Sequence, residues 1–293
     1  MVDSDLRSIT PEWIDLLISP VARESYDFVT PYYLRHKYDG TITNSIIYPL
    51  TRALYGKNIR QPIGGDFGFS GELAGFFLSK EIWDSDIARY GIDIWMTTTA
   101  VASNFKVCQS FLGAKIHDPK DPASDLSSML TQVVGSAFNL METYERVWKK
   151  TGRIKEIKIF GFPHEVGLEP VNVNIEAMYG KFLLGVNELI PLWSLILSQD
   201  ITDFLSESKK LPLQAFDFPD ETWVRIIYLF AAAYHKKTMN RDNLLKSLTP
   251  LYLGKIASFV QETLESSSQA VEKRLENLCD EFAKNKPFLV ENF

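Results

Sequence analysis

At 293 residues, the chain is long enough to bury a large core, in one big domain or in one domain with a substantial extension. Apolar residues make up 45% and charged residues 23%, which is ordinary for a globular protein. The formal net charge is −6 and no block of basic residues occurs, so a nucleic-acid partner is not expected.

Cysteine content and hydropathy indicate which classes of protein are not expected. Cys108 and Cys279 are far apart and form no CxxC pair, so neither a disulfide framework nor a zinc knuckle is indicated. No basic start followed by an apolar run marks a secretory signal. The longest apolar stretch, 182–197, contains polar residues and Pro191 and is too short for a bilayer. We therefore expect a cytoplasmic protein without a membrane span.

The first half of the chain is predicted to contain both helices and strands. Thr10 followed by Pro11 predicts a helix start, and Gly56 predicts a helix end. The expected elements are a helix from Pro11, a strand at 26–35 in which Pro31 indicates an edge or a break, helices at 44–55, 72–78 and 92–102, a strand at 106–118 and a helix at 126–149.

The second half is predicted to be almost entirely helical. We expect a division into two parts, residues 1–150 and residues 151–293. The expected helices of the second part are 180–205, 220–237, 241–246 and 255–284.

Two acidic residues open the chain, in the stretch DSD. In an extended or turning backbone, the side chains of Asp3 and Asp5 can converge on one hard cation such as Mg²⁺ or Mn²⁺. The alternative is a polar, frayed chain start. His117 ends a predicted strand and lies between Lys115 and Lys120. A metal on these ligands, with the two lysines beside it, would suit a nucleoside diphosphate leaving group.

Glycine is dense in IGGDFGFSGE, residues 63–72. Such density indicates backbone that adopts unusual dihedral angles or lies close to another group. Gly64 and Gly65 would let Asp66 approach a bound sugar, although an ordinary tight loop is the alternative. Asp93 stands at a predicted helix start, where a capping role is the simplest interpretation.

Five motifs occur in this order along the chain: DSDLRS, DGTITNSIIYPL, QPIGGDFGFSGE, YGIDIW and AKIHDPK. The series resembles the glucosyl-3-phosphoglycerate synthases and their mannosylglycerate synthase relatives. It covers roughly the first half of the chain. The resemblance implies a GT-A fold and a metal-dependent, retaining glycosyltransferase that moves a hexose from a nucleotide sugar, of the UDP-glucose or GDP-mannose type, to a glycerate-like acceptor.

The resemblance also implies roles for individual residues. The metal ligands of the family fall on Asp3, Asp5 and His117, and the flanking basic residues fall on Lys115 and Lys120. The remaining implied substrate-side residues are Thr43 in the acceptor segment 40–43, Gly64 and Gly65 in the glycine-rich loop, the acidic Asp66, which we take as the catalytic candidate, and Asp93.

Two departures from the family pattern bear on function. Thr41 stands where the phosphoglycerate enzymes carry an arginine for the acceptor phosphate, so an unphosphorylated acceptor becomes more plausible. Only Met1 and Val2 precede the DSD, whereas the family has a nucleotide-binding half there. The expected fold is therefore α/β, a truncated GT-A domain followed by a helical region, which binds donor poorly. The alternative is a non-catalytic helical assembly or scaffold module, and in either case we expect a homo-oligomer.

Overall fold

The structure is a computed structural model that describes residues 1–82, 86–116, 126–163, 167–168 and 171–293. The chain divides into two compact units. The first unit comprises Met1–Lys120 and Leu140–Val171, and the second comprises Asp121–Asn139 and Asn172–Phe293. Residues 151–171 thus belong with the first unit, whereas the sequence suggested a division near residue 150.

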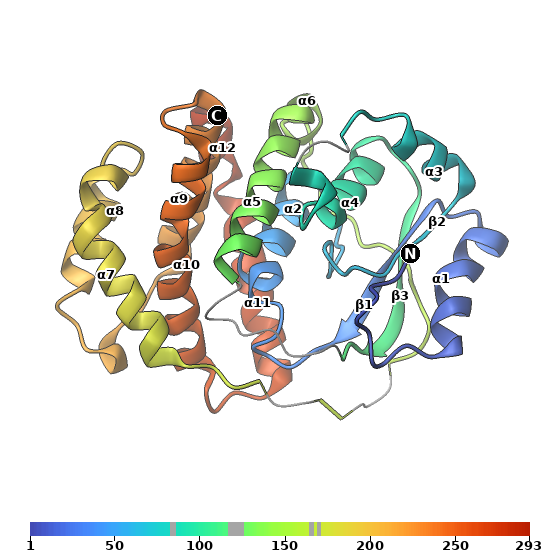
Figure 1. Ribbon diagram of the computed structural model, residues 1–293, viewed down its shortest axis with the longest axis horizontal. Helices are drawn as coiled ribbons and strands as arrows, with labels where there is room; N and C mark the ends of the chain where they lie inside the picture. The colour runs from blue at the N-terminus through green and yellow to red at the C-terminus, as the bar shows by residue number, and fades with distance from the viewer. Residues whose placement is uncertain (83–85, 117–125, 164–166, 169–170) are drawn as a thin grey trace. The chain divides into compact units, whose positions relative to one another are not determined.

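The first unit contains an α/β arrangement, which confirms the expected class (Figure 1). Its described strands form one four-stranded sheet in the order β2-β1-β3-β4. β1 pairs in parallel with β3, β3 pairs in parallel with β4, and β2 is antiparallel to β1. The elements are α1 (Pro11–Glu24), β1 (Phe28–Leu34), a π-helical turn (Thr43–Ile47), α2 (Tyr48–Tyr55), β2 (Gly68–Phe69), α3 (Gly71–Leu78), a 3₁₀ turn (Asp86–Ala88), α4 (Ile92–Ala102), β3 (Val107–Ala114), α6 (Glu145–Trp148) and β4 (Ile159–Phe160).

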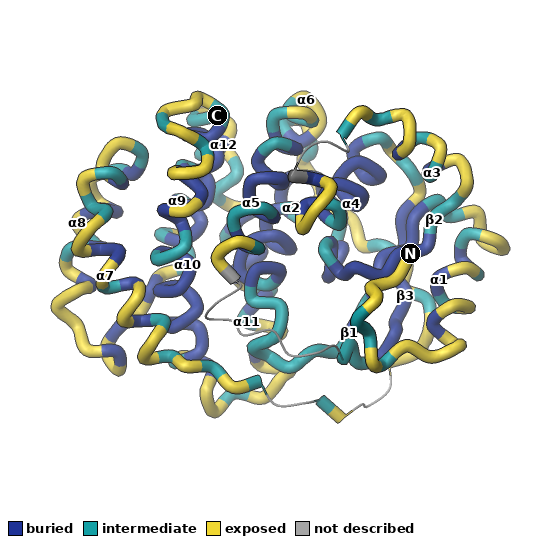
Figure 2. Tube along the Cα trace, viewed as in Figure 1, coloured by how far each residue is buried: buried dark blue, intermediate teal, exposed yellow. Residues whose placement is uncertain are grey.

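Both β1 and β3 are buried along most of their length, as Figure 2 shows. On one face α1 supplies Trp13 and Leu17, which pack with side chains of β1 and β3. α4 also lies against β1. Burial of both faces explains why the strand sequence FVTPYYL lacks a polar and apolar alternation.

The proline in β1 is accommodated by the topology of the sheet. β2 pairs only with Phe28 and Val29, so from Pro31 onward β3 is the described strand partner of β1. On the side of β1 away from β3, no described strand needs the backbone N–H that Pro31 lacks. There the side chain of Gln61 takes over, because its Oε1 accepts from the N–H of Tyr33 at 2.9 Å and its Nε2 donates to the Tyr33 carbonyl at 3.0 Å.

Among the described residues of the second unit, every regular element is a helix. Its helices are the first part of α5 (Leu126–Thr143), α7 (Ile175–Trp193), α8 (Gln199–Ser208), a 3₁₀ turn (Leu213–Ala215), α9 (Asp220–Lys236), α10 (Arg241–Thr263), α11 (Ser268–Lys284) and α12 (Lys286–Asn292). The helix expected at 180–205 is two helices, and the helix expected at 126–149 ends at Thr143.

The prediction of separate helices at 241–246 and 255–284 was wrong, because α10 runs without interruption through Pro250 and Gly254. Packing against α7 explains this. A Cβ on Gly185 would lie 2.3 Å from Cβ of Pro250, and a Cβ on Gly254 would lie 2.4 Å from the ring of Phe182. The glycines let the two helices approach closely, and burial of that contact outweighs the helix-breaking tendency of proline.

Candidate functional site

The carboxyl ends of β1 and β3 lie at one edge of the sheet. Leu34 is in register with Ala114, so the residues that follow, Arg35 and Lys115, leave the sheet side by side. Open α/β sheets bind ligands beyond the carboxyl ends of their strands. This edge is therefore the place to look for a site.

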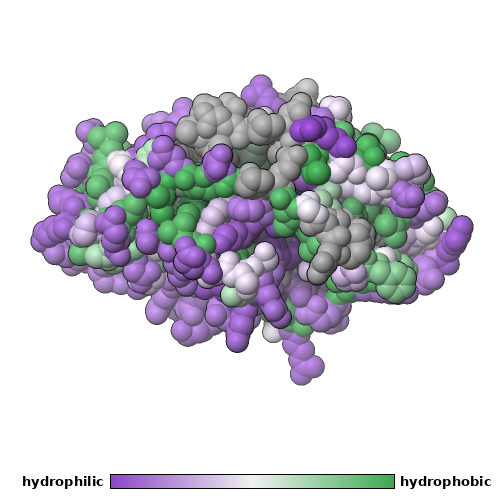
Figure 3. All heavy atoms as spheres, turned by 90° about the horizontal axis from the view of Figure 1, so that it is seen from below, coloured by the Kyte–Doolittle hydropathy of each residue, from purple (hydrophilic) through white to green (hydrophobic). Residues whose placement is uncertain are grey.

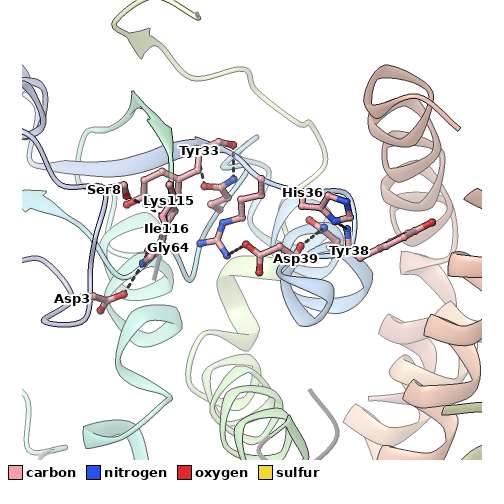
Figure 4. A network of polar contacts seen from close by, with 12 residues as sticks. Asp3, Ser8, Tyr33, His36, Tyr38, Asp39, Gly64, Lys115 and Ile116 are labelled. Atoms are coloured by element: carbon pink, nitrogen blue, oxygen red, sulfur yellow. Dashed lines mark hydrogen bonds and ion pairs between the residues drawn. The ribbon is translucent and has the colours of Figure 1, made fainter. Parts of the chain in front are cut away.

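Lys115 is the centre of a polar cluster at this edge (Figure 4). Its side chain is only 5% exposed. Nζ donates to Oδ2 of Asp3 at 2.6 Å, to the carbonyl of Gly64 at 2.8 Å and to Oδ2 of Asp66 at 2.9 Å. An ammonium has three N–H groups, so these three acceptors satisfy it completely. We call Asp3, Asp66, Asp93 and Lys115 the Lys115 cluster.

Asp66 is the fully buried carboxylate of the cluster. Its Oδ1 accepts from the backbone N–H of Asp3 at 2.8 Å. Its Oδ2 accepts from Lys115 and from the hydroxyl of Tyr33. Burial, with the Asp66 charge adding to it, raises the pKa of Tyr33 well above its usual value, so this hydroxyl remains a donor. Both carboxylate oxygens of Asp66 therefore bind groups of the protein itself.

The paired glycines before Asp66 are required by close contacts. Gly65 has a φ of +83°, and a Cβ there would lie 2.2 Å from Oδ2 of Asp3. A Cβ on Gly64 would lie 2.2 Å from Cγ of Pro31. The expectation that this loop lies against another group is confirmed, and one such group is the Asp3 carboxylate.

Asp93 is the second residue of α4, whose N-cap is Gly91, so Asp93 is not the capping residue. Its carboxylate accepts from the backbone N–H of Gly65. Burial raises the pKa of Asp93 to about 7, the charges of Asp3 and Asp66 add to this, and Lys115 opposes it. The cluster thus carries an excess of negative charge despite the lysine.

The beginning of the chain is hydrogen-bonded along the same edge. The N–H of Phe67 donates to the Met1 carbonyl at 2.9 Å, and the N–H of Arg7 donates to the Ile116 carbonyl at 2.9 Å. The N–H of Ile116 in turn donates to Oγ of Ser8 at 3.0 Å. These bonds connect residues 1–8 with the glycine-rich loop and with the end of β3. The DSD therefore lies within the site, where Asp5 is half-buried.

The expected acceptor segment, 40–43, follows β1. Gly40 has a φ of +66°, the carbonyl of Thr41 accepts from Oγ of Ser45 at 2.7 Å, and Thr43 is buried. Arg35 Nη1 lies 3.6 Å from Oδ2 of Asp39 (Figure 4).

Sequence analysis missed Arg35 as a neighbour of this segment. A Cβ on Gly40 would lie 3.3 Å from Nη1 of Arg35. Nε of Arg35 is buried and has no hydrogen-bond partner within the part of the chain that the structure describes. Its position directly after β1, four residues before Asp39, is the signal that could have found it. The guanidinium also lies 5.4 Å from the ring centre of Tyr33, and Nζ of Lys115 lies 5.5 Å from the same ring.

Of the predicted site residues, Asp3, Gly64, Gly65, Asp66, Asp93 and Lys115 come together, and Thr41 and Thr43 lie in the segment after β1. His117 and Lys120 lie outside the described residues. Within the part of the chain that the structure describes, no three metal-ligating side chains converge in a metal-binding arrangement.

No protein-family model matches the chain, and no curated protein matches it. In the described part of the chain, every helix is too short or too polar to cross a bilayer.

Proposed function

We propose that the chain is a hexosyltransferase that uses a divalent cation to transfer a hexose, with retention, from a nucleotide sugar to a glycerate-type acceptor. The supporting observation is the Lys115 cluster. Three segments that carry the sequence resemblance, the DSD, the glycine-rich loop and the YGID turn, meet Lys115 of a fourth segment through hydrogen bonds and charge coupling at one sheet edge.

The chemistry of the donor set fits a hard divalent cation. Asp3 is 43% exposed, so its carboxylate can reach a ligand from solvent, and the cluster retains net negative charge beside it. Carboxylate oxygens are preferred ligands of Mg²⁺ and Mn²⁺. Asp3, Asp5 and His117 would hold the ion. When bound, it would supply positive charge opposite the departing diphosphate.

Lysines would complete the diphosphate side of the site. Lys115 is close enough to Asp3 to act on the same anionic group, and Lys120 is the second basic residue that we assign there. A cation near a leaving diphosphate lowers the energy of the charge that develops on it.

The carboxylates of Asp66 and Asp93 differ in their hydrogen bonds to the protein. We assign Asp66 to the sugar side of the site. Because both of its oxygens accept internal hydrogen bonds, it would act there by positioning Asp3 and Lys115. Asp93 is half-buried, and with a pKa near 7 it can accept or donate a hydrogen bond to a sugar hydroxyl.

The acceptor side is proposed at Thr43 and Arg35. Thr41 is neutral, but the Arg35 guanidinium lies beside Gly40 and offers a fork-shaped donor for a carboxylate. A glycerate-type acceptor without a phosphate fits this pairing better than a phosphorylated one.

Transfer itself is the test. The protein is incubated with Mn²⁺, UDP-glucose or GDP-mannose, and glycerate or 3-phosphoglycerate, and glycosylated products are detected by mass spectrometry. We expect product with glycerate, and its loss in Asp5→Ala and His117→Ala. His235→Ala, whose ring stacks on Phe293 in the second unit, is the matched control. Unchanged activity in the first two variants would refute their assignment as ligands.

A second candidate, a helical assembly module, is favoured by apolar side chains that reach the surface. Leu184 is 59% exposed and Leu195 is 68% exposed in the second unit. Figure 3 shows hydrophobic side chains in patches among hydrophilic ones on the face that it draws. Light scattering tests this candidate, which a strict monomer would contradict.

A further inference from the structure

The Lys115 cluster contains a cation of its own at the carboxylate that we assign to the metal. We propose that Lys115 is a replaceable counter-ion, which holds Asp3 while no divalent cation is bound and is displaced from Asp3 when one binds. The inference rests on the proposed function for the metal-binding role of Asp3, and it adds a regulatory role for a residue of the same site.

The partners of Lys115 differ in how readily they can be exchanged. Asp66 is fully buried, and its oxygens are also held by Tyr33 and by the backbone of Asp3. The Gly64 carbonyl belongs to a loop packed against Pro31. Asp3, by contrast, is 43% exposed. It is therefore the partner that an ion from solvent reaches first.

Displacement from Asp3 leaves the ammonium well satisfied. Nζ keeps the Gly64 carbonyl at 2.8 Å and Asp66 at 2.9 Å, and only one N–H needs a new acceptor. If Asp3 were its only anionic partner, Lys115 would instead become a buried unpaired charge, which is costly. The bonds to Gly64 and Asp66 make the exchange feasible without movement of the loop.

The charges of the cluster favour the exchange. Among the described residues, Lys115 is the one side-chain cation that forms ion pairs with Asp3 and Asp66, and the Asp93 carboxyl is coupled to the same charges. The ammonium of Met1 also interacts with Asp66, whereas Lys115 is the cation paired with Asp3. A divalent cation on Asp3 brings more positive charge to this carboxylate than the ammonium does, whereas the ammonium opposes its approach through like-charge repulsion.

The first test compares two charge-matched variants, Lys115→Gln and Lys158→Gln. Lys158 belongs to the same unit and pairs with Glu24 at 3.5 Å, with both side chains 51% exposed. Binding of Mn²⁺ alone is measured by electron paramagnetic resonance of the free ion. We expect Lys115→Gln to bind Mn²⁺ roughly tenfold more tightly than wild type. Lys158→Gln should stay within about twofold of wild type because exposed charges are screened.

Circular dichroism first establishes that Lys115→Gln is folded. A folded Lys115→Gln that binds Mn²⁺ no more tightly than wild type would overturn the proposal. So would a wild-type protein that binds no Mn²⁺. Tighter binding in Lys115→Gln without any binding of nucleotide sugar would leave this inference standing and remove the proposed function.

A second measurement uses the wild type, so it does not depend on the folding of a variant. The protein is labelled with ¹⁵N at the lysine Nζ, and its ammonium resonances are followed as diamagnetic Mg²⁺ is added. We expect the Lys115 resonance to shift in proportion to bound Mg²⁺ while that of Lys158 stays in place. A Lys115 resonance that does not move at saturating Mg²⁺ would overturn the proposal.

Discussion

In the described part of each unit, a buried lysine is bonded to an aspartate and to a backbone carbonyl. In the first unit Lys115 binds Asp66 and the Gly64 carbonyl. In the second unit Nζ of Lys255 donates to Oδ1 of Asp220 and to the Phe218 carbonyl, both at 2.6 Å. The lysine side chains are 5% and 4% exposed. Locally the two lysines are alike, and the difference lies in their other partners.

The ion pairs of the second cluster are balanced. Asp220 also pairs with Arg274, which pairs with Glu262 at 2.7 Å, so two cations contact two carboxylates. Burial alone would raise the pKa of Asp220, but the hydrogen bonds from Arg274 and Lys255 hold it below its usual value. We call Asp220, Lys255, Glu262 and Arg274 the Lys255 cluster.

In the Lys115 cluster one cation contacts two carboxylates, and the pKa of the third carboxyl, Asp93, shifts upward. Burial raises the pKa of both Asp93 and Asp220; at Asp93 the charges of Asp3 and Asp66 add to this, whereas at Asp220 the two cations reverse it. A balanced network has a structural role, whereas an excess of carboxylates beside an exposed member suits the binding of an external cation.

The largest expected effect comes from removing an anion from the balanced network. Asp220→Asn leaves Lys255 buried without a carboxylate and Arg274 with only Glu262 among the ion pairs described. We expect the free energy of unfolding to fall by about 3–5 kcal/mol in denaturant titrations. Glu207→Gln, in an exposed pair with Lys210, should cause no measurable change. An equally small change for Asp220→Asn would contradict the structural role.

Removing an anion from the unbalanced cluster should cost less. Asp66→Asn replaces one accepting carboxylate oxygen with an NH2 group, which is a donor and faces the donors that this oxygen bound. Lys115 nevertheless keeps Asp3 as its counter-ion. We expect a loss of about 2–4 kcal/mol in unfolding free energy, together with weaker Mn²⁺ binding because Asp3 loses its backbone partner. If Asp66→Asn were more destabilising than Asp220→Asn, the excess of carboxylates would not be the distinguishing feature.

A glycine substitution tests the close approach of Asp3. Gly65→Ala places a Cβ 2.2 Å from Oδ2 of Asp3 at a φ of +83°, and we expect it to cost about 1–3 kcal/mol and to weaken Mn²⁺ binding. Gly71→Ala is the control, because a Cβ there meets nothing within 4 Å. Equal Mn²⁺ affinities in the two variants would show that Asp3 does not need its contact with the loop.

The smallest expected effect is a pH dependence that belongs to Asp93. Its folded pKa of about 7 lies above its ordinary value of 3.8, so between these pH values the folded state binds more protons than the unfolded state. Stability should therefore fall as the pH rises from 4 to 7. We expect a fall of about 1–2 kcal/mol in EDTA, relative to Asp93→Asn, since the side chain is partly exposed. Parallel pH profiles of the two proteins would refute the shifted pKa.

Much of the fold could be predicted because local signals agree with the tertiary environment. Gly56, with a φ of +65°, ends α2, and α4 has the predicted bounds of 92–102. The continuity of α10 through Pro250 could not be predicted, because it depends on glycine contacts with α7, some 65 residues earlier in the chain.

Several members of the candidate site could be predicted from the sequence, whereas their bonds could not. The predicted strand-end position of His117, with Lys115 two residues earlier, and the glycines before Asp66 indicated a ligand-binding edge. The ion pair of Lys115 with Asp3 joins residues 112 positions apart, so no sequence window contains it. Arg35 was missed for a similar reason, because its proximity to Gly40 follows from the turn after β1.

The most direct test of the central claim is cation-dependent binding of a nucleotide sugar. Saturation-transfer NMR detects weak complexes, and it is applied to UDP-glucose and GDP-mannose in Mg²⁺ and then in EDTA, with wild type and Asp3→Asn. We expect a transfer signal for one of the two donors with wild type in Mg²⁺, and its loss in EDTA and in Asp3→Asn. Signals that are absent for both donors in Mg²⁺, or unchanged in EDTA, would contradict this claim.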